Sequence, residues 1–300
     1  MGKQLEHDYA EHRGINVKAL VCGYGGFIGT AVAKLLGEGD LHKHEDGDLT
    51  TPEGWEHALR CNPDTVFMCA GITGGSGTDP MAFVHDNLVM HAQMFKACSE
   101  HGVKKILAFS STTGYPATGF KVIENQYFDG DPHPAYFNPA HTRRFIERLS
   151  AMYADKIDTV WLRVSNAYGP GDNYDTQTSH VIAATVRKVA ERQDPIVVWG
   201  DGSNVRDAVY IDDVAQAAVM AAEWPAGAYN IAADDSMSVN DIVDFLSDDY
   251  KPLVEFDLTK PSMLPTRLLN THKANSLGWH PTVKMRDGLL KTLEWYRASQ

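Results

Sequence analysis

The sequence predicts an α/β fold in which a doubly wound parallel sheet is followed by a smaller C-terminal α/β lobe. Short apolar runs that suit buried strands alternate with longer segments of helical periodicity through about the first 170 residues. A glycine-rich turn joins the first strand to the first helix, and the alternation becomes irregular after Pro170. We therefore expect one domain at 15–170, with about 204–234, and a substrate-binding lobe at 171–203 and 235–300.

In the first part of the chain, expected strands and helices alternate, as they do in a parallel sheet with helices on both faces. The expected strands are residues 17–21, 64–71, 104–111 and 158–171. The expected helices are one that follows Gly26, a long amphipathic one around 81–98, and one at 138–156.

The second part of the chain contains fewer regular elements. We expect a helix at 179–193, a strand at 195–200, several short elements and a final helix at 285–298. The first ~14 residues are polar, as loosely ordered termini often are.

Composition excludes several classes of protein. The formal charge of −12 argues against a nucleic-acid or anionic-membrane surface, since both need a basic face. No apolar run approaches the ~18 residues that span a bilayer, and no secretory segment follows Met1. The four cysteines lack paired metal-ligand spacing, so we expect free thiols, no metal site and a cytoplasmic protein.

Gly23, Gly26 and Gly29 form a G-x-x-G-x-x-G motif between the first strand and the first helix. Glycine lets a pyrophosphate approach the N–H groups at the helix N-terminus, where the helix dipole favours an anion. The alternative is a tight structural turn. In this position the motif predicts a Rossmann-type dinucleotide site, and its spacing is typical of short-chain dehydrogenases.

The segment 39–50, where the 2′ position of the adenine ribose is normally read, is compressed and charged. His42, Lys43 and His44 are suited to a 2′-phosphate and favour NADP over NAD. A solvated charged loop is the alternative interpretation.

Consecutive hydroxyls end the third expected strand, at Ser110 and Ser111. Ligands bind at the carboxyl edge of open α/β sheets, where a hydroxyl can hydrogen-bond a carbonyl and a tyrosine phenol can give or take a proton. The alternative is a turn or helix cap. Because Tyr136 lies near the start of a helix downstream, we favour the functional interpretation.

The chain resembles a known family through "GYGGFIG", "GDLT", "FSSTTGYP", "NAYGPGDNYD", "TSHVIAA", "VVWGDGSNVRDAVYIDDVA" and "LGWHPTVKMRDGLLKT". These motifs look like those of the extended short-chain dehydrogenases that act on nucleotide sugars, and within them most like the GDP-L-fucose synthase family of GDP-4-keto-6-deoxymannose epimerase/reductases. The similarity runs from about Val17 to the C-terminus. The block 166–215 is its most specific part.

The resemblance implies a role for individual residues. The catalytic set is Ser111, Tyr136 and His180. The cofactor-binding set is Gly23, Gly26, Phe27, Ile28, Gly29, Asp48, Leu49 and Ala70. The substrate-binding set is Thr113, Asn166, Arg187, Lys188, Val198, Trp199, Arg206 and Arg267. Arg206 is expected on the diphosphate, which suits a guanidinium. The alternatives are surface ion pairs for the arginines and a capping or core position for His180.

Ala140 is the first departure from the family. It stands four residues after Tyr136, where the family has a lysine that holds the nicotinamide ribose and stabilises the phenolate. His141 points about 100° away from Ala140 on a helix, whereas Arg143 shares the face of Tyr136. The sequence leaves three possibilities open: a rerouted proton relay, a disabled enzyme, or a designed inactivation.

Thr113 is the second departure, because fucose synthases carry a second acid/base cysteine there. A threonine hydroxyl is a much weaker base than a thiolate, which argues against full double epimerisation. Thr112 and Thr113 also supply no carboxylates of the kind that dehydratases of the superfamily use.

The resulting hypothesis is an NAD(P)-dependent enzyme that reduces C4 of a 4-keto sugar linked to a nucleotide, with GDP the expected nucleotide and NADP the expected cofactor. The alternatives are a nucleotide-sugar epimerase that holds NAD tightly and a catalytically silent binder. Segments 81–98 and 142–154 correspond by resemblance to helices that pair two subunits, so a homodimer is expected.

Overall fold

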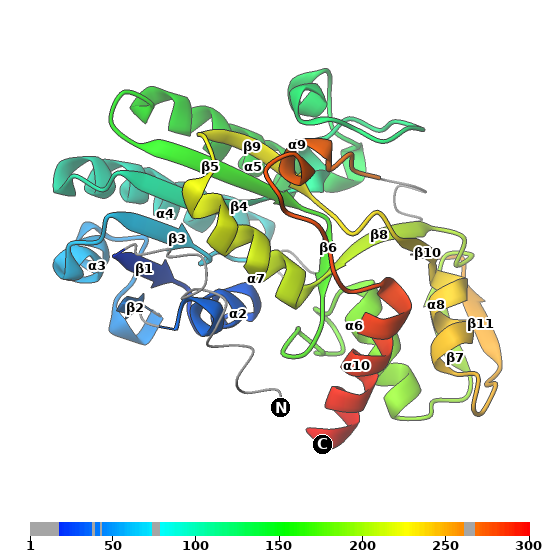
Figure 1. Cartoon of the computed structure of the whole chain (residues 1–300). Helices are drawn as coiled ribbons and strands as arrows, with labels where there is room; N and C mark the ends of the chain where they lie inside the picture. Colours follow the sequence, from blue (N-terminus) through cyan, green and yellow to red (C-terminus); the bar gives the residue numbers. More distant parts are fainter. Residues whose placement is uncertain (1–17, 38–39, 43, 74–78, 261–267) are drawn as a thin grey trace.

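Six parallel strands form the largest sheet, in the spatial order β2-β1-β3-β4-β5-β9 (Figure 1). The strands are β1 (Ala19–Cys22), β2 (Asp40–His42), β3 (Thr65–Met68), β4 (Lys105–Ser111), β5 (Asp158–Val164) and β9 (Gly227–Ile231). The computed structural model describes residues 18–37, 40–42, 44–73, 79–260 and 268–300. The strand order reverses between β1 and β3, which is where open α/β sheets bind ligands. The predicted doubly wound parallel sheet is confirmed.

Helices cover both faces of this sheet because successive strand residues point to opposite sides. On one face, Val21 and Phe67 pack in the same apolar cluster as Val214 of α7. On the other face, Leu20 packs in the same cluster as Met94 of α4. The helices of the first face are α2 (Phe27–Leu36) and α7 (Ile211–Met220), and those of the second are α3 (Pro52–Ala58), α4 (Pro80–His101) and α5 (Phe137–Ser150).

The strand expected at 158–171 is two strands. Ser165 breaks the run, and its backbone N–H donates to the carbonyl of Ile231 on β9. The chain then leaves the large sheet and enters a three-stranded sheet of order β10-β8-β6. Its strands are β6 (Asn166–Tyr168), β8 (Val205–Tyr210) and β10 (Ser236–Ser238).

Much of the irregular second part of the chain lies on the right of Figure 1, and many of its residues pack in a second apolar cluster. Its remaining helices and strands are α6 (Val181–Ala190), β7 (Ile196–Trp199), α8 (Val239–Leu246), β11 (Val254–Asp257) and α10 (Met285–Ala298). Helix α9 (His272–Asn275) lies instead beside β9, and its Ala274 packs in the apolar cluster of the large sheet. The expected helix at 179–193, strand at 195–200 and helix at 285–298 are confirmed, with shorter bounds for the first two. Strand β8 pairs outside the large sheet, and the proposed division into two domains stays a prediction.

Short 3-10 helices join these elements. They are η1 (His44–Asp46), η2 (Leu59–Cys61), η3 (Thr112–Gly114), η4 (Glu124–Phe128), η5 (Pro134–Tyr136), η6 (Ala151–Tyr153) and η7 (Ala221–Glu223). The helix expected at 138–156 therefore begins one residue earlier, ends at Ser150 and continues as η6.

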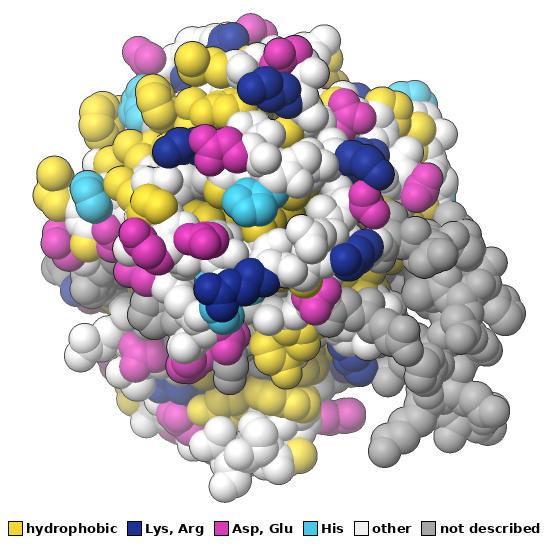
Figure 2. All heavy atoms as spheres, turned by 90° about the vertical axis from the view of Figure 1, so that its left-hand side faces the viewer, with side chains coloured by type: hydrophobic (Ala, Val, Ile, Leu, Met, Phe, Trp, Pro, Cys, Tyr) yellow, Lys and Arg dark blue, Asp and Glu magenta, His cyan; other side chains and the backbone are white. Residues whose placement is uncertain are grey.

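The surface shows how the acidic charge is distributed. On the face in Figure 2, Asp and Glu side chains are interspersed with Lys and Arg, and the described residues form no continuous basic area there. Among the described residues, no helix is both long and apolar enough to cross a membrane.

Candidate active site

The glycine turn after β1 is built by close backbone approach. Gly23 has φ +80°, and a Cβ at this position would lie 2.5 Å from the backbone nitrogen of Ala70 at the end of β3. A Cβ on Gly29 would lie 2.1 Å from the carbonyl oxygen of Gly23. No other residue fits either position without moving the turn.

The N-terminus of α2 is open to an anion. Gly26 is its N-cap and has no side chain with which to cap the free N–H groups of the first turn. Phe27 and Ile28 provide those N–H groups and are partly buried. The turn and the uncapped helix together fit the pyrophosphate of a dinucleotide.

The adenine side of the predicted cofactor site is less clearly built. The carboxylate of Asp48 accepts hydrogen bonds of 2.8 Å from the N–H and hydroxyl of Thr50. Leu49 is buried in the core, and its carbonyl accepts from the indole of Trp55 at 2.7 Å. His42 is buried and contacts the carbonyl of Gly47. Lys43 lies outside the described residues.

Strand register aligns the predicted residues along one edge of the sheet. Cys22 pairs with Met68, and Met68 pairs with Ala108, so Gly23 and Ala70 follow neighbouring strands at the same edge. Ser111 ends β4 and pairs with Val164 on β5. Asn166 follows two residues later. The carboxyl edge therefore carries the glycine turn, Ser111 and Asn166 in that order.

Ser111 is positioned to donate a hydrogen bond. Its hydroxyl oxygen accepts from the N–H of Thr113 at 3.2 Å and from the hydroxyl of Thr113 at 3.1 Å. A serine hydroxyl has two acceptor positions and one hydrogen. With both acceptor positions occupied, that hydrogen remains for a ligand. Ser111 is also the N-cap of η3, so the capping and functional interpretations describe the same residue.

Ser110 belongs to a buried network that the sequence did not indicate. Its hydroxyl donates to Glu147 of α5 at 2.5 Å, and Glu147 accepts from Arg163 of β5 at 2.6 Å. Arg163 also donates to the hydroxyl of Tyr115, which in turn donates to Asn230 of β9. This network fixes the end of β4 against α5. Its sequence signal was Arg163, an isolated charged residue within the apolar segment 159–164.

Tyr136 lies at the junction of η5 and α5, partly exposed. Its ring is 6.0 Å from that of His133. Ala140, which stands where the family has a lysine, is fully buried and contributes only a methyl group to the core. The middle of α5 is held to the edge by Arg144, whose Nε donates to the carbonyl of Gly114 at 2.7 Å.

His180 is the N-cap residue of α6 but makes no capping hydrogen bond with its side chain. The ring is accessible to solvent, yet the surrounding protein removes part of its hydration and lowers the pKa of the imidazole below its ordinary value. Because a lowered pKa favours the neutral form, His180 is an available base at neutral pH. The alternative of a core or capping histidine is therefore not what the geometry shows.

The predicted diphosphate contacts lie on two neighbouring strands. The side-chain amide of Asn166 on β6 donates to the carbonyl of Asp207 on β8 at 2.7 Å. Arg206 precedes Asp207, is partly buried and donates to the carbonyl of Val205 at 3.2 Å. The structure thus brings Asn166 and Arg206 together.

The remaining substrate candidates lie on α6 and β7. Lys188 donates to the carbonyl of Val197 at 2.6 Å, and Arg187 contacts Glu191 at 3.5 Å. The Nε of Arg187 is buried and has no hydrogen-bond partner among the described residues. Val198 packs in the core, whereas Trp199 is 55% exposed, with the ammonium of Lys260 5.1 Å from its ring centre. Arg267 lies outside the described residues.

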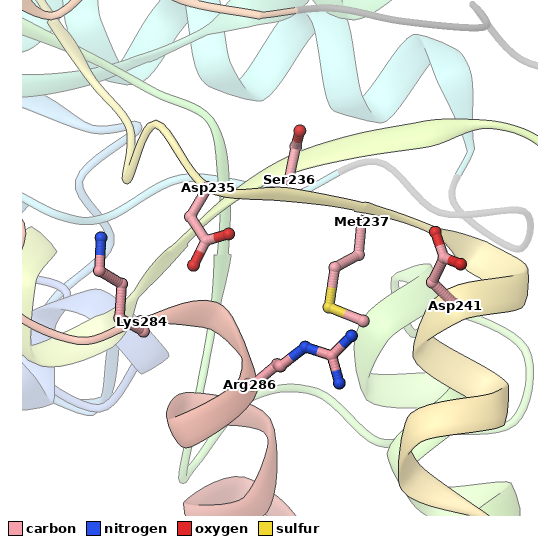
Figure 3. Close-up of a pocket in the computed structure, with 6 residues that line it drawn as sticks. All are labelled: Asp235, Ser236, Met237, Asp241, Lys284 and Arg286. Carbon is pink, nitrogen blue, oxygen red and sulfur yellow. The ribbon is translucent and has the colours of Figure 1, made fainter.

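A cavity of about 480 Å³ lies between β10 and the start of α10 (Figure 3), and its lining residue Met237 pairs with Arg206 of β8. It is lined by Asp235, Ser236, Met237, Asp241, Lys284 and Arg286. Asp235 accepts a hydrogen bond from the backbone N–H of Met285. The carboxylate of Asp241 accepts from the backbone N–H of Ser238 in the capping box of α8. None of the predicted site residues lines this cavity, so we place the site at the carboxyl edge of the large sheet.

A parallel sheet with a glycine turn, a serine after β4 and a tyrosine at the start of α5 defines a Rossmann-type protein of the short-chain dehydrogenase class. Residues 19–232 match the NAD dependent epimerase/dehydratase family. The chain belongs to this family, which makes it by descent an NAD(P)-dependent oxidoreductase or epimerase, as the sequence predicted.

Individual relatives agree with this assignment. GDP-L-fucose synthase 1 of Arabidopsis thaliana is 30% identical, over 94% of this chain and 93% of that protein. The structure of a GDP-L-fucose synthetase from Naegleria fowleri bound to NADP has a TM-score of 0.86 at 21% identity, covering 95% of this chain and 93% of that one. A GDP-6-OMe-4-keto-L-xylo-heptose reductase from C. jejuni has a TM-score of 0.85 at 20% identity, covering 95% and 99%. The last two likenesses show the fold.

Proposed function

We propose that the chain is an NADP-dependent reductase of a 4-keto sugar linked to a nucleotide, with GDP as the nucleotide. The observation that carries this proposal is the position of the Ser111 hydroxyl at the carboxyl edge, between the glycine turn and Asn166. Support comes from the family and from relatives named as GDP-L-fucose synthases. The NADP-bound structure of the Naegleria fowleri relative favours NADP over NAD.

The proposed chemistry assigns one task to each side chain at the edge. When bound, the dinucleotide supplies a hydride to the carbonyl carbon at C4 of the sugar. Ser111 donates its hydroxyl hydrogen to the carbonyl oxygen and polarises it. Tyr136 gives the proton that this oxygen takes up as it becomes an alcohol. Gly23, Gly26 and the first turn of α2 hold the pyrophosphate.

The nucleotide part of the substrate would extend from β6 toward α6. Arg206 and Asn166 lie together on β8 and β6 and suit the diphosphate. Arg187 has a buried Nε without a partner among the described residues, and it is our second candidate for a phosphate contact. The exposed ring of Trp199 offers a stacking surface for the nucleoside.

Epimerisation is the second candidate activity, favoured by His180. Its lowered pKa leaves a neutral imidazole that can remove a carbon-bound proton. The hydroxyl of Thr113 is bonded to Ser111 and is not a second base. We therefore propose reduction with at most a limited epimerisation. We also propose that the protein works as a homodimer through α4 and α5.

The test follows NADPH oxidation with GDP-4-keto-6-deoxymannose, with products analysed by NMR. We expect turnover by the natural chain and a 10²- to 10⁴-fold loss of kcat in Tyr136→Phe. Tyr153→Phe is the matched control, because Tyr153 stacks on Phe95 in the core at 5.5 Å. Full activity of Tyr136→Phe would refute the proposed role.

The same assay separates the alternatives. A protein that purifies with NAD and interconverts sugar nucleotides without added reductant is an epimerase. A protein that binds NADPH and sugar nucleotide tightly but never turns over is a silent binder, and the proposed function is then wrong.

A further inference from the structure

Arg143 occupies a position at the carboxyl edge that no predicted role explains. It lies seven residues after Tyr136, so the two side chains leave nearly the same side of α5. Its Nη1 lies 3.4 Å from the carbonyl oxygen of Phe109 on β4. Its Nη2 lies 3.6 Å from the point where a Cβ on Gly71 would be. The guanidinium therefore reaches both β4 and the end of β3.

The strand register places this contact near the carboxyl ends of β3 and β4, where Phe109 lies two residues before Ser111. Met68 and Ala108 are paired, and Gly71 and Ser111 each lie three residues further toward the carboxyl end. Because residue 71 is glycine, no side chain lies between Nη2 and the backbone there. The Oδ1 of Asn87 would also lie 3.2 Å from a Cβ at this position. The guanidinium thus lies close to the edge that carries the cofactor-binding turn and Ser111.

The charge of Arg143 is not balanced by a close carboxylate. Among the described residues, no Asp or Glu lies within ion-pair distance of it. Glu147, one turn further along α5, is already bound by Arg163 and Ser110. Burial lowers the pKa of the Arg143 guanidinium, and the more distant Tyr127 and Glu147 offset this only in part. Such a group is stabilised by a ligand that supplies hydrogen-bond acceptors.

We infer that Arg143 donates hydrogen bonds to the hydroxyls of the nicotinamide ribose. In this role it replaces the lysine that the family has at position 140, where this chain has alanine. The inference rests on the proposed function only in that a dinucleotide binds at the glycine turn. A guanidinium has five donors in a fixed plane and spans two vicinal hydroxyl oxygens well. The Arg143 side chain is also much longer than the methyl group of Ala140, which is buried in the core.

The experiment measures binding rather than turnover. NADPH and adenosine 2′,5′-bisphosphate, which lacks the nicotinamide ribose, are titrated into the full-length natural chain and into Arg143→Met. We expect the variant to bind NADPH at least tenfold more weakly, as for the loss of hydrogen bonds from a charged donor, and the bisphosphate with unchanged affinity. Equal loss for both ligands would mean a merely structural role and would overturn the inference. Unchanged NADPH binding would overturn it as well.

Two further variants sharpen the result. Arg148→Met removes the neighbouring guanidinium, which lies over the Phe128 ring at 4.0 Å, and is expected to bind both ligands normally. Arg143→Met combined with Ala140→Lys restores a cation at the edge and is expected to regain NADPH affinity. A double variant as weak as the single one argues against a cofactor contact. Because binding is measured without a sugar substrate, these outcomes are independent of whether the proposed reduction occurs.

Discussion

Ser110 and Ser111 are adjacent hydroxyls with opposite surroundings, and they separate stability from catalysis. Ser110 is buried and donates to Glu147, so Ser110→Ala leaves a buried carboxylate short of one hydrogen bond. We expect the free energy of unfolding to fall by ~1–3 kcal/mol with kcat little changed. In Ser111→Ala we expect kcat to fall ~10²- to 10³-fold and stability by less than ~1 kcal/mol.

Urea unfolding and the NADPH oxidation assay, applied to both variants, decide this prediction. Ser110→Ala serves as the control for Ser111→Ala, since both remove one hydroxyl from the same strand. If Ser110→Ala is the variant that loses kcat, the proposal that Ser111 and not Ser110 meets the substrate is wrong.

Sequence patterns at residue scale identified which residue types matter but not which partners they have. Two hydroxyls at the end of a strand predicted a ligand edge, and strand alternation implies that only one of them faces it. The partner of Ser110 is Glu147, 37 residues away, and no local pattern links the two. Likewise Arg143 was visible as a residue on the face of Tyr136, whereas its approach to Gly71 depends on how α5 packs against the sheet.

The turn between β1 and α2 gives a prediction at the scale of elements. A methyl group on Gly29 would lie 2.1 Å from the carbonyl oxygen of Gly23, so Gly29→Ala must displace α2 from the turn. We expect a loss of ~2–3 kcal/mol of stability and of measurable NADPH binding. Gly25→Ala is the matched control, because no atom lies within 4 Å of a Cβ there. Thermal unfolding and NADPH titration test the pair, and equal behaviour of both variants would contradict the close approach.

Strand β8 contains a carboxyl group whose protonation affects folding. Asp207 accepts from the backbone N–H of Leu269 at 3.0 Å, and its other oxygen has no partner among the described residues. Burial, with a smaller contribution from Asp234, raises its pKa to about 7. Because the pKa in the folded state is the higher one, the stability that this group contributes is full below about pH 4 and is lost as the pH rises through about 7.

Asp207→Asn keeps the acceptor for Leu269 and removes the titration. We compare the free energy of unfolding of the variant with that of the natural chain. We expect this difference to shift by ~2 kcal/mol in favour of the variant from pH 5 to pH 8, since each pKa unit is worth about 1.4 kcal/mol. Denaturant unfolding across this pH range measures the difference, in which other titrating groups cancel. Parallel curves for the two proteins would mean that Asp207 titrates normally.

Periodicity predicted the long elements well because each buries a continuous apolar stripe. The helix at 285–298 has the expected bounds, and the strand expected at 104–111 begins one residue later, at Lys105. Short elements were missed because their partners are distant in sequence: β6 leaves the large sheet after Ser165 and pairs with β8, about 40 residues on. The three residues of β2 show too little pattern to be recognised before β1 pairs with them.

At the scale of the whole molecule, two exposed side chains point to an interface. Phe145 on α5 is 58% exposed and Met152 on η6 is 77% exposed. They are seven residues apart and so lie on the same side of the continuous α5–η6 segment. This segment packs beside α4, through the stacked rings of Phe95 and Tyr153. Large apolar side chains that gather on one face are often covered by a partner, which supports the proposed homodimer.

Phe145→Asp tests this interface, because it places a carboxylate where the second subunit would remove it from water. We expect the natural chain to sediment as a dimer at micromolar concentration and the variant to dissociate at least a hundredfold more readily, while NADPH binding by the monomer persists. Leu258→Asp is the matched control: Leu258 is 73% exposed but lies beyond β11, far along the chain from α4 and α5. A natural chain that sediments as a monomer, or a control that dissociates as readily as Phe145→Asp, would rule out pairing through α4 and α5. If only Phe145→Asp dissociates, the same helix supports Tyr136 and Arg143 on its inner side and the second subunit on its outer side, so pairing would also steady the proposed site.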